Sequence, residues 1–450
     1  MLLTADSGGG DMPSRIEPYI TMDELDEPIE LVKGPLHLKG PTEVTIASDL
    51  TFQWSPSRRV VFDGECAAGD ISFKDMEADW ELQLDGVDSN PPVLLLETSP
   101  LTTPVPVRGI VNGVTGVGQS PFERLRFSLA NFPEYIGEPL TWGEGPSRGA
   151  SRDGLHGSDD LGSWAINTVP ETRELAKQAR KGAGFVITHV GEWIPASGSL
   201  TSAEAGEILS MLHIWFGFLR GAWSGPLFLQ GLCDGLPQWR QIAQWTVEDG
   251  REVSTWMPSV TPISLAGLFA GFSLHWRDER WRVPLRTAVW WLVQANADAT
   301  GTESRIVLAQ VALELLAWVH VVEVEQMHTR SDFERLSAAG RLRALLQSLA
   351  IPTGVPGYMP ALAQLCDREA FDGPGVITRV RNALVHASEN KRAMIAALKG
   401  EVRYECAQLA LQYVDLVLLA VCGYEGYYAQ RGFRGWKGDD EVLVPWADSA

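Results

Sequence analysis

The sequence predicts an α+β protein of several domains, in which a β-rich N-terminal region with a sandwich-like or barrel-like fold precedes an all-α bundle. Three observations support this fold class. The chain has 450 residues, which is enough for two or three domains. Short β-branched and aromatic runs, separated by Pro, Gly and Asp, follow one another from about residue 31. From about residue 285 the apolar residues instead recur at helical spacing.

The β-rich region is predicted from segments that are short, apolar and bounded by turn residues. We expect strands at 44–46, 50–54, 60–62, 80–84 and 122–131. In the last of these, Leu125, Phe127 and Leu129 alternate with smaller or polar residues, which indicates one buried face. The segment 143–163 is rich in Gly, Ser, Asp and Arg, so we expect a long exposed loop there.

A mixed segment follows this loop. Residues 184–190 are β-branched and apolar and predict a strand. A helix is expected to open at Ser202, because Leu209, Leu212 and Phe216 then fall on one face.

The C-terminal third is predicted to be helical. The expected helices contain Trp290 and Trp291, or span 303–325, 333–349 and 401–422, and one more begins after the turn at 372–375. Gly423 is a suitable C-cap for the 401–422 helix.

These patterns divide the chain into five parts. They are an acidic flexible tail (1–30), a β-rich module (31–165), a mixed α/β regulatory segment (166–284), a helical domain (285–430) and a C-terminal tail that packs on the helical domain (431–450).

The charge distribution limits the function. The formal net charge is −20, which argues against a general nucleic-acid coat protein, because phosphate binding needs cations. Residues 281–430, however, carry 14 basic and 15 acidic residues, so this part is close to neutral. The sequence therefore allows a local phosphate site in the C-terminal region and disfavours one in the N-terminal region.

Cysteine use and hydropathy point to the cytoplasm. The five cysteines form no C-x-x-C pair, which suggests neither a disulfide framework nor a structural zinc site. The first residues lack the basic and apolar regions of a signal peptide, and the apolar stretches are interrupted by polar residues or glycine. We expect core helices, no membrane contact, no cofactor and no metal; His320 and His328 lie too far apart for a compact ligand set.

One Gly-rich segment imitates a nucleotide-binding loop. Residues 113–120 follow the P-loop spacing, but Gln119 stands where Lys is required and Pro121 follows where a helix should begin. Without the lysine, the phosphates lose their charge partner, so we interpret this segment as a connection between strands.

The strongest candidate site is formed by Arg381, Asn382 and His386. An arginine binds phosphate, an amide forms hydrogen bonds, and an imidazole exchanges protons near pH 7. On an ideal helix, residues i and i+5 diverge by roughly 140°. Convergence on one ligand therefore needs a distorted helix or a second protomer. The alternative is a surface arginine and a half-buried histidine with no shared role.

Further residues could support this site. Glu314 lies inside an apolar helix, where it could hold Arg381 or His386, or face outward without a role. Lys391, Arg392, Lys399 and Arg403 follow the motif. They could steer RNA toward it or form an ordinary solvated helix face.

Residues from about 285 to 450 resemble the HEPN superfamily, and in particular the large bacterial ApeA-like proteins of the abortive-infection type. The resemblance rests on four segments of the chain: 312–316, 381–386, 423–427 and 444–446. It implies an all-α HEPN bundle that dimerises, so that the two R-x(4)-H motifs face each other in a composite, metal-independent ribonuclease site. It also implies an RNA substrate, with tRNA as one candidate, and a role in antiphage defence under the control of a phage-derived trigger.

The chemistry of RNA cleavage can be assigned to these residues. A base removes the 2′-OH proton, the oxygen attacks phosphorus, and an acid protonates the leaving 5′-oxygen. His386 suits one or both proton transfers, Arg381 neutralises the phosphate oxygens, and Asn382 orients the phosphate or the histidine. We expect the N-terminal region to sense or regulate. The alternative is a HEPN module that dimerises or binds a ligand without catalysis.

Overall fold

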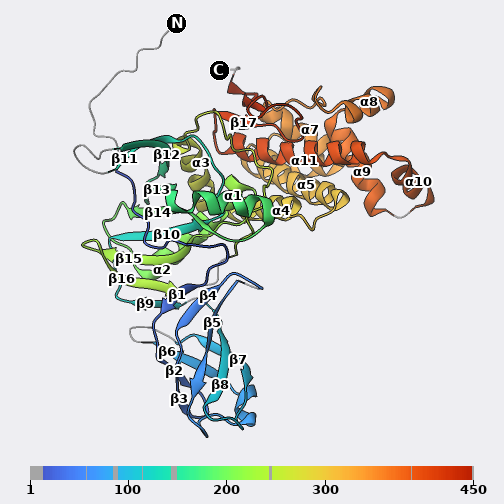
Figure 1. Ribbon diagram of the computed structural model, residues 1–450. Coiled ribbons are helices and arrows are strands. Elements are labelled where there is room, and N and C mark those ends of the chain that lie inside the picture. Colours follow the sequence, from blue (N-terminus) through green and yellow to red (C-terminus); the bar gives the residue numbers. More distant parts are fainter. Residues whose placement is uncertain are drawn as a thin grey trace.

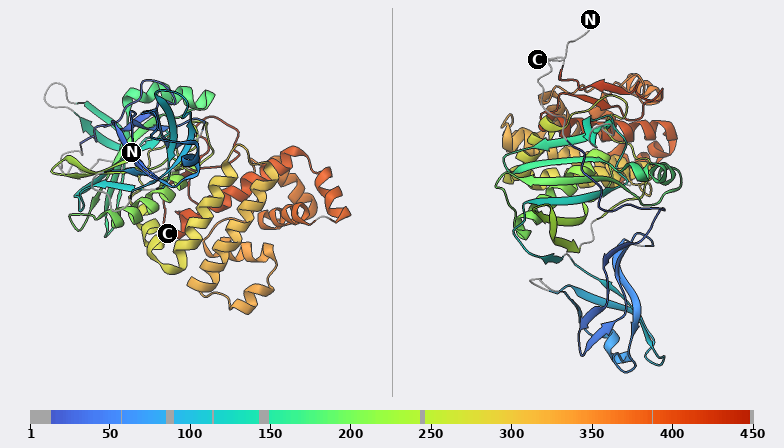
Figure 2. Two further views of the ribbon diagram at one scale, coloured as in Figure 1. Left: turned by 90° about the horizontal axis from the view of Figure 1, so that it is seen from below. Right: turned by 60° about the vertical axis from the view of Figure 1, so that its left-hand side comes forward.

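The computed structural model describes residues 14–56, 58–84, 90–113, 115–142, 149–242, 246–386 and 388–447. Figure 1 shows three parts: a small β-rich part (blue), a second sheet with helices beside it (cyan to green), and a helical part (yellow to red). Figure 2 shows the same parts from below and from the side. The predicted class, an α+β multidomain protein with a β-rich N-terminal region and a C-terminal helical region, is confirmed.

The first part is a curved antiparallel sheet of eight strands in the order β1-β4-β5-β8-β7-β6-β2-β3. Its strands are β1 Ile29–Val32, β2 Leu36–Lys39, β3 Glu43–Ile46, β4 Leu50–Gln53, β5 Arg59–Cys66, β6 Trp80–Gln83, β7 Pro92–Thr98 and β8 Val105–Val111. Buried and exposed residues alternate along β2 and β3, so one face of the sheet is buried in a core, which also includes Phe185, Ile187 and Leu227 from farther along the chain. The expected strands at 44–46, 50–54, 60–62 and 80–84 lie here.

The middle part is a second antiparallel sheet in the order β11-β12-β13-β14-β10-β15-β16-β9. Its strands are β9 Thr115–Gly118, β10 Arg124–Ala130, β11 Glu138–Trp142, β12 Gly149–Ser158, β13 Gly162–Thr168, β14 Ile187–Pro195, β15 Leu227–Cys233 and β16 Leu236–Ile242. Helices α1 Arg173–Gly182, α2 Ser202–Arg220 and α3 Ala266–Arg277 accompany it. The sheet therefore combines strands from both the predicted 31–165 module and the predicted 166–284 segment.

Alternation along β10 gives this sheet two different faces. Phe127 points toward α2, where its ring lies 5.7 Å from that of Phe216. Gly191 is its cross-strand partner, and a Cβ there would lie 2.5 Å from the Phe127 ring, so glycine makes room for it. On the other face, Arg126 donates two hydrogen bonds to Glu192, at 2.9 and 2.8 Å. The aromatic face joins the helices in one continuous core.

Residues 14–28 lie along the polar face of the middle sheet, where the sequence led us to expect a flexible tail. The Ile16 amide donates to Asn167 at 2.8 Å, and the Tyr19 hydroxyl donates to the carbonyl of Phe228 at 2.7 Å. Met22 is buried. Side-chain hydrogen bonds to distant strands cannot be read from local composition, which explains the difference. Residues 1–13 of the expected tail lie outside the described residues.

The segment 143–163 also differs from expectation. Residues 149–158 form β12, which pairs with β11 and β13, although they contain five Gly and Ser residues in ten positions. Pairing on both sides supplies the backbone hydrogen bonds that local propensity does not predict. Residues 143–148 lie outside the part of the chain that the structure describes.

The helical part begins at α4 and ends in a short two-stranded sheet. Its elements are α4 Glu279–Asn296, α5 Thr302–Ala317, the π-helical segment η4 Trp318–Val324, α6 Arg330–Arg335, α7 Ala338–Ser348, α8 Pro360–Glu369, α9 Gly373–Val385, α10 Glu389–Ala397, α11 Gly400–Val421, β17 Tyr427–Ala429 and β18 Glu441–Leu443. Helix α5 packs against α4, α7, α9 and α11 and is therefore central, as its apolar sequence predicts.

Two helices in this part, Thr302–Val324 and α11, are long and apolar enough to cross a bilayer by length and composition. In α11, 83% of the most apolar window is buried inside the fold. Packing in the centre of the bundle accounts for this composition.

A buried polar cluster ties the end of the chain to the bundle. Arg431 forms an ion pair with Asp415 of α11, and both side chains are 1% exposed. Arg431 also donates to Asn296 at 2.9 Å, and Asn296 donates to the carbonyl of Gly221, the C-cap of α2, at 3.0 Å. Four separate chain segments therefore share one hydrogen-bonded cluster.

Replacing Arg431 with Met is expected to lower the free energy of unfolding by about 3–5 kcal/mol, because Asp415 would remain buried without a counter-charge. Chemical denaturation of the full chain measures the change. Arg434→Met is the matched control: Arg434 pairs with Glu401 at 3.3 Å, but both side chains are at least half exposed, so only a small effect is expected. Equal effects of the two substitutions would contradict the importance of the buried pair.

Candidate functional site

The candidate site lies at the end of α9, and the start of this helix is firmly fixed. Asp372 is the N-cap, and its carboxylate accepts the Gly375 amide at 2.8 Å. Arg343 of α7 holds the same carboxylate through two hydrogen bonds, at 2.5 and 2.8 Å. Burial acts to raise the pKa of Asp372, but these hydrogen bonds outweigh it and hold the pKa below its usual value. The predicted turn at 372–375 therefore opens the helix.

Close packing also fixes where α9 runs. A Cβ at Gly373 would lie 2.2 Å from the hydroxyl oxygen of Tyr413, so only glycine lets α9 start this close to α11. Val376, Ile377 and Val380 are buried against the bundle. Arg381 and Asn382, near the end of the same helix, are by contrast only half-buried.

The helix ends one residue before His386. This residue is the C-cap, with φ −113° and ψ 109°, and its amide donates to the Asn382 carbonyl at 3.3 Å. The imidazole is exposed, and Val385 before it is 43% exposed. Because the backbone at His386 is extended, the angle of roughly 140° between residues i and i+5 of an ideal helix does not apply to Arg381 and His386.

Arg381 and Asn382 are half-buried neighbours. The guanidinium Nη1 donates to the Asn382 amide oxygen at 3.3 Å, and its buried Nε has no hydrogen-bond partner among the described residues. No ion pair joins Arg381 to an acidic residue in the described part of the chain. By contrast, Arg379, on the same helix, pairs with Glu369 at 2.7 Å. Arg381 therefore carries a positive charge that no carboxylate among the described residues neutralises.

Glu314 does not join this group. It is half-buried on α5, where its carboxylate accepts a hydrogen bond from Gln310 at 2.6 Å. No ion pair or hydrogen bond links it to Arg381 or His386 within the described ranges. Its supporting role therefore rests on the sequence alone.

The four basic candidates are distributed around α10. Lys391 and Arg392 lie on α10, which contains no buried residue, and Lys399 is the exposed N-cap of α11. Arg403 is paired with Glu303 of α5 at 2.5 Å. Residues 379–403 contain six basic and two acidic side chains, but Arg379 and Arg403 form ion pairs with Glu369 and Glu303, which lie outside this range.

The other sequence candidates lie away from this site. Residues 115–118 of the P-loop imitation form strand β9, whose Gly118 approaches the Gln238 carbonyl too closely for a Cβ. His320 is buried within η4, and burial lowers its pKa. Among the described residues, no group of three or more His, Cys, Asp or Glu side chains is placed to hold a metal ion.

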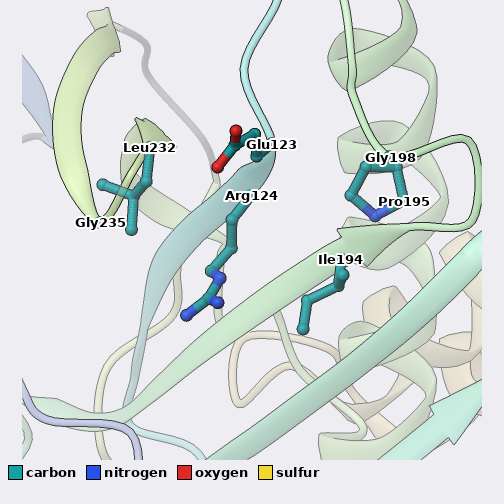
Figure 3. A pocket seen from close by; sticks show the side chains of 7 residues that line it. All are labelled: Glu123, Arg124, Ile194, Pro195, Gly198, Leu232 and Gly235. Atoms are coloured by element: carbon teal, nitrogen blue, oxygen red, sulfur yellow. The ribbon is translucent and has the colours of Figure 1, made fainter.

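A hollow of about 290 Å³ lies on the middle sheet, and Figure 3 shows its lining. Arg124 of β10 and Ile194 of β14 extend in the same direction there. Arg124 donates to Glu192 at 3.1 Å, and the Glu123 carboxylate accepts the Asp234 amide at 3.1 Å. Both charged side chains that line this hollow therefore already have hydrogen-bond partners within the protein.

Sequence reasoning missed a second hollow, of about 510 Å³, between α2 and α4. Arg286 and Trp290 line it from α4, and they are four residues apart. An arginine and a tryptophan at i and i+4 share one helix face, so this spacing could have revealed them.

The two larger parts of the structure correspond to regions that match known family models. Residues 118–253 match the model of the YopA central domain and cover most of the middle sheet. Residues 278–441 match the model of the YopA C-terminal domain, which runs from the start of α4 to β18 and contains the whole candidate site.

One curated relative aligns over nearly the whole chain. It is the SPbeta prophage-derived uncharacterized protein YopA of Bacillus subtilis (strain 168), which is 24% identical over 428 residues. The alignment covers 91% of this chain and 92% of the relative. No solved structure matches the chain.

Replacing Asp372 with Ala is expected to lower the free energy of unfolding by about 1 kcal/mol, the usual contribution of an N-cap side chain. Because the pKa of Asp372 is lowered in the fold, its contribution is present at neutral pH and is lost as pH falls through the folded pKa. Denaturation at neutral and acidic pH measures both effects. Asp367→Ala, an exposed position on α8, should change neither; a pH-independent effect of Asp372→Ala would contradict the assignment.

Proposed function

We propose that this chain is a metal-independent endoribonuclease of the HEPN type, in which Arg381, Asn382 and His386 of two protomers form one composite site. The observation that carries the proposal is a guanidinium, Arg381, without a carboxylate partner among the described residues, followed five residues later on the same helix end by the exposed imidazole of His386, in a segment where basic residues outnumber acidic ones. RNA brings its own phosphate to such a cation and its own nucleophile, the 2′-OH.

We assign the roles from the chemistry of the side chains. His386 removes the 2′-OH proton, the 2′-oxygen forms a bond to phosphorus, and the bond to the 5′-oxygen breaks. The protonated His386 of the second protomer then donates to the leaving oxygen. Arg381 neutralises the charge on the non-bridging oxygens, and Asn382 keeps the guanidinium in place through its amide oxygen. The products are a 2′,3′-cyclic phosphate and a 5′-OH.

A dimer is supported by the surface around the motif. Val385 is exposed, Leu384 is half-buried, and α10 beside them contains no buried residue. A second protomer packed on this surface would bring the two copies of His386 together and cover these apolar side chains. Exclusion of water by that contact would strengthen the interaction of Arg381 with phosphate.

The test uses purified full-length protein and total tRNA in the presence of EDTA. We expect cleavage at defined positions, with 5′ ends that accept phosphate directly from a polynucleotide kinase. His386→Ala should reduce the rate by about 10²–10⁴-fold, the usual contribution of a general acid or base. Arg381→Ala should reduce it by about 10²–10³-fold, as expected for a group that stabilises transition-state charge.

Two matched controls separate chemistry from folding. Arg379→Ala removes an arginine of the same helix that is paired with Glu369, and His328→Ala removes a histidine outside the site. Both should cut RNA at the normal rate, and all four variants should have the same mass in solution. RNA that stays intact with the unaltered protein, or cleavage that survives both site substitutions, would instead favour a non-catalytic module that dimerises or binds a ligand.

The biological role that fits this activity is cytoplasmic defence against phage by damage to host RNA. The relative named above is prophage-derived, which favours a role in conflicts that involve phages. Such an enzyme must be held inactive in healthy cells, and we assign the sensing or inhibitory role to the N-terminal sheets. The five cysteines are unpaired, in keeping with a reducing compartment.

The first sheet contributes no residue to the cluster that contains the helical bundle, so its removal leaves that cluster whole, although it exposes Phe185 and other residues of the middle part that share the core of the first sheet. Replacing residues 33–112 with a short Gly-Ser linker is expected to change the toxicity of the expressed protein or abolish its response to phage infection. Growth curves with and without infection measure both. The same deletion combined with His386→Ala should be harmless; unchanged toxicity and response in the deletion alone would contradict a regulatory role.

A further inference from the structure

The hollow between α2 and α4 has the size of a small-molecule site. Its volume of about 510 Å³ lies within the usual range for such pockets. Ser210, His213 and Ile214 line it from α2, and Arg286, Thr287 and Trp290 line it from α4. The two helices belong to different parts of the fold, the middle sheet and the helical bundle.

Aromatic rings form one wall of this hollow. His213 stacks on Trp223, with ring centroids 4.5 Å apart and planes 16° apart, and Trp223 lies 5.4 Å from Trp290. Gly217, one turn after His213, permits this arrangement, because a Cβ there would lie 2.6 Å from the Trp223 ring. The His213 Nδ1–H donates to the Gly225 carbonyl at 2.9 Å, which fixes the imidazole plane. At the end of this row Trp290 is 48% exposed and offers a ring to a ligand.

Arg286 supplies a positive charge. Its side chain is exposed, and no ion pair to it occurs within the described ranges. Arg282, one turn earlier, is by contrast paired with Glu207 of α2 and lies over the Trp276 ring at 5.4 Å. Burial lowers the pKa of His213 to about 4, so the imidazole is uncharged near pH 7. The guanidinium of Arg286 is therefore the charged group that lines the hollow.

We propose that this hollow binds a planar aromatic ring that carries an anionic group. The ring stacks on Trp290, and the anionic group pairs with Arg286. The Ser210 hydroxyl donates a hydrogen bond to the Gly206 carbonyl at 2.9 Å, so its oxygen remains able to accept a hydrogen bond from the ligand. Thr287 provides a second hydroxyl in the lining of the hollow. Nucleoside monophosphates and aromatic carboxylates share this chemistry. The inference is independent of the ribonuclease proposal, because none of these residues belongs to the R-x(4)-H motif.

Isothermal titration of the full-length protein with adenosine 5′-monophosphate and, separately, with indole-3-acetate tests the proposal and distinguishes the two sources. Saturable binding of at least one probe is expected. Adenosine, which lacks the charge, and inorganic phosphate, which lacks the ring, should each bind at least about fivefold more weakly than the nucleotide. Trp290→Ala and Arg286→Ala should each raise the Kd of the probe that binds by about fivefold or more, which is the lower limit expected for loss of a stacked ring.

The matched controls change the same residue types outside the hollow. Arg282→Ala lies one turn away on α4, and Trp436→Ala removes a tryptophan that is 85% exposed elsewhere. Both should bind like the unaltered protein, and circular dichroism should show that all four variants are folded. The proposal is overturned if neither probe gives saturable heat up to about 10 mM, ten times a millimolar Kd. It is also overturned if Trp290→Ala and Arg286→Ala bind as tightly as the controls.

Discussion

The buried ion pair between Arg431 and Asp415 is the interaction on which the arrangement of the other parts depends. A charge pair in the interior is stable only when further hydrogen bonds satisfy the guanidinium, and here the amide oxygen of Asn296 accepts from it while the amide nitrogen of Asn296 donates to the Gly221 carbonyl. Nearby, the Glu441 carboxylate accepts the amides of Ser259 and Thr261, at 2.7 and 2.5 Å. The last residues of the chain thus hold the middle sheet and the helical bundle together.

The shared core has consequences for the candidate site. Rings from the middle sheet, α2 and α3 continue without interruption into the helices of the bundle. The start of α9 is fixed against α7 and α11, whereas its end lies beside α10 at the outer edge of the bundle (Figure 1). Rigid support beneath an exposed end suits a site that a second protomer completes, because little ordering is then required when the partner binds.

The sequence predicted the parts of the fold that depend on local pattern. The alternation at 122–131 predicted β10, and helical spacing predicted α4, α5 and α11. The sequence did not predict β12 or the packing of residues 14–28 on the middle sheet, because both depend on hydrogen bonds to other segments of the chain. Helix 333–349 was expected as one element but divides into α6 and α7, with Ser337 capping the second.

The candidate site was predictable only in part, for a related physical reason. Residue types indicated Arg381, Asn382 and His386, but the extended backbone at His386 and the absence of a contact between Glu314 and the motif depend on tertiary packing. Likewise, Arg403 looked available in the sequence and is engaged by Glu303 in the structure. The hollow beside Trp290 needed two helices from different parts of the chain, which no single segment reveals.

Strand β16 contacts the chain both where it enters the first sheet and just after it leaves that sheet. Arg240 donates to the carbonyl of Leu31, where the chain enters that sheet, and pairs with Val117, just after the chain has left it. The entry and exit points therefore both lie at Arg240, so the eight strands form a lobe beside β16 and β9, between the N-terminal segment 14–28 and the first strand of the middle sheet (Figure 1). In such an arrangement the length and sequence of the lobe can change in evolution while the strand connections of the middle sheet stay the same, provided that the apolar contact with Phe185 is kept.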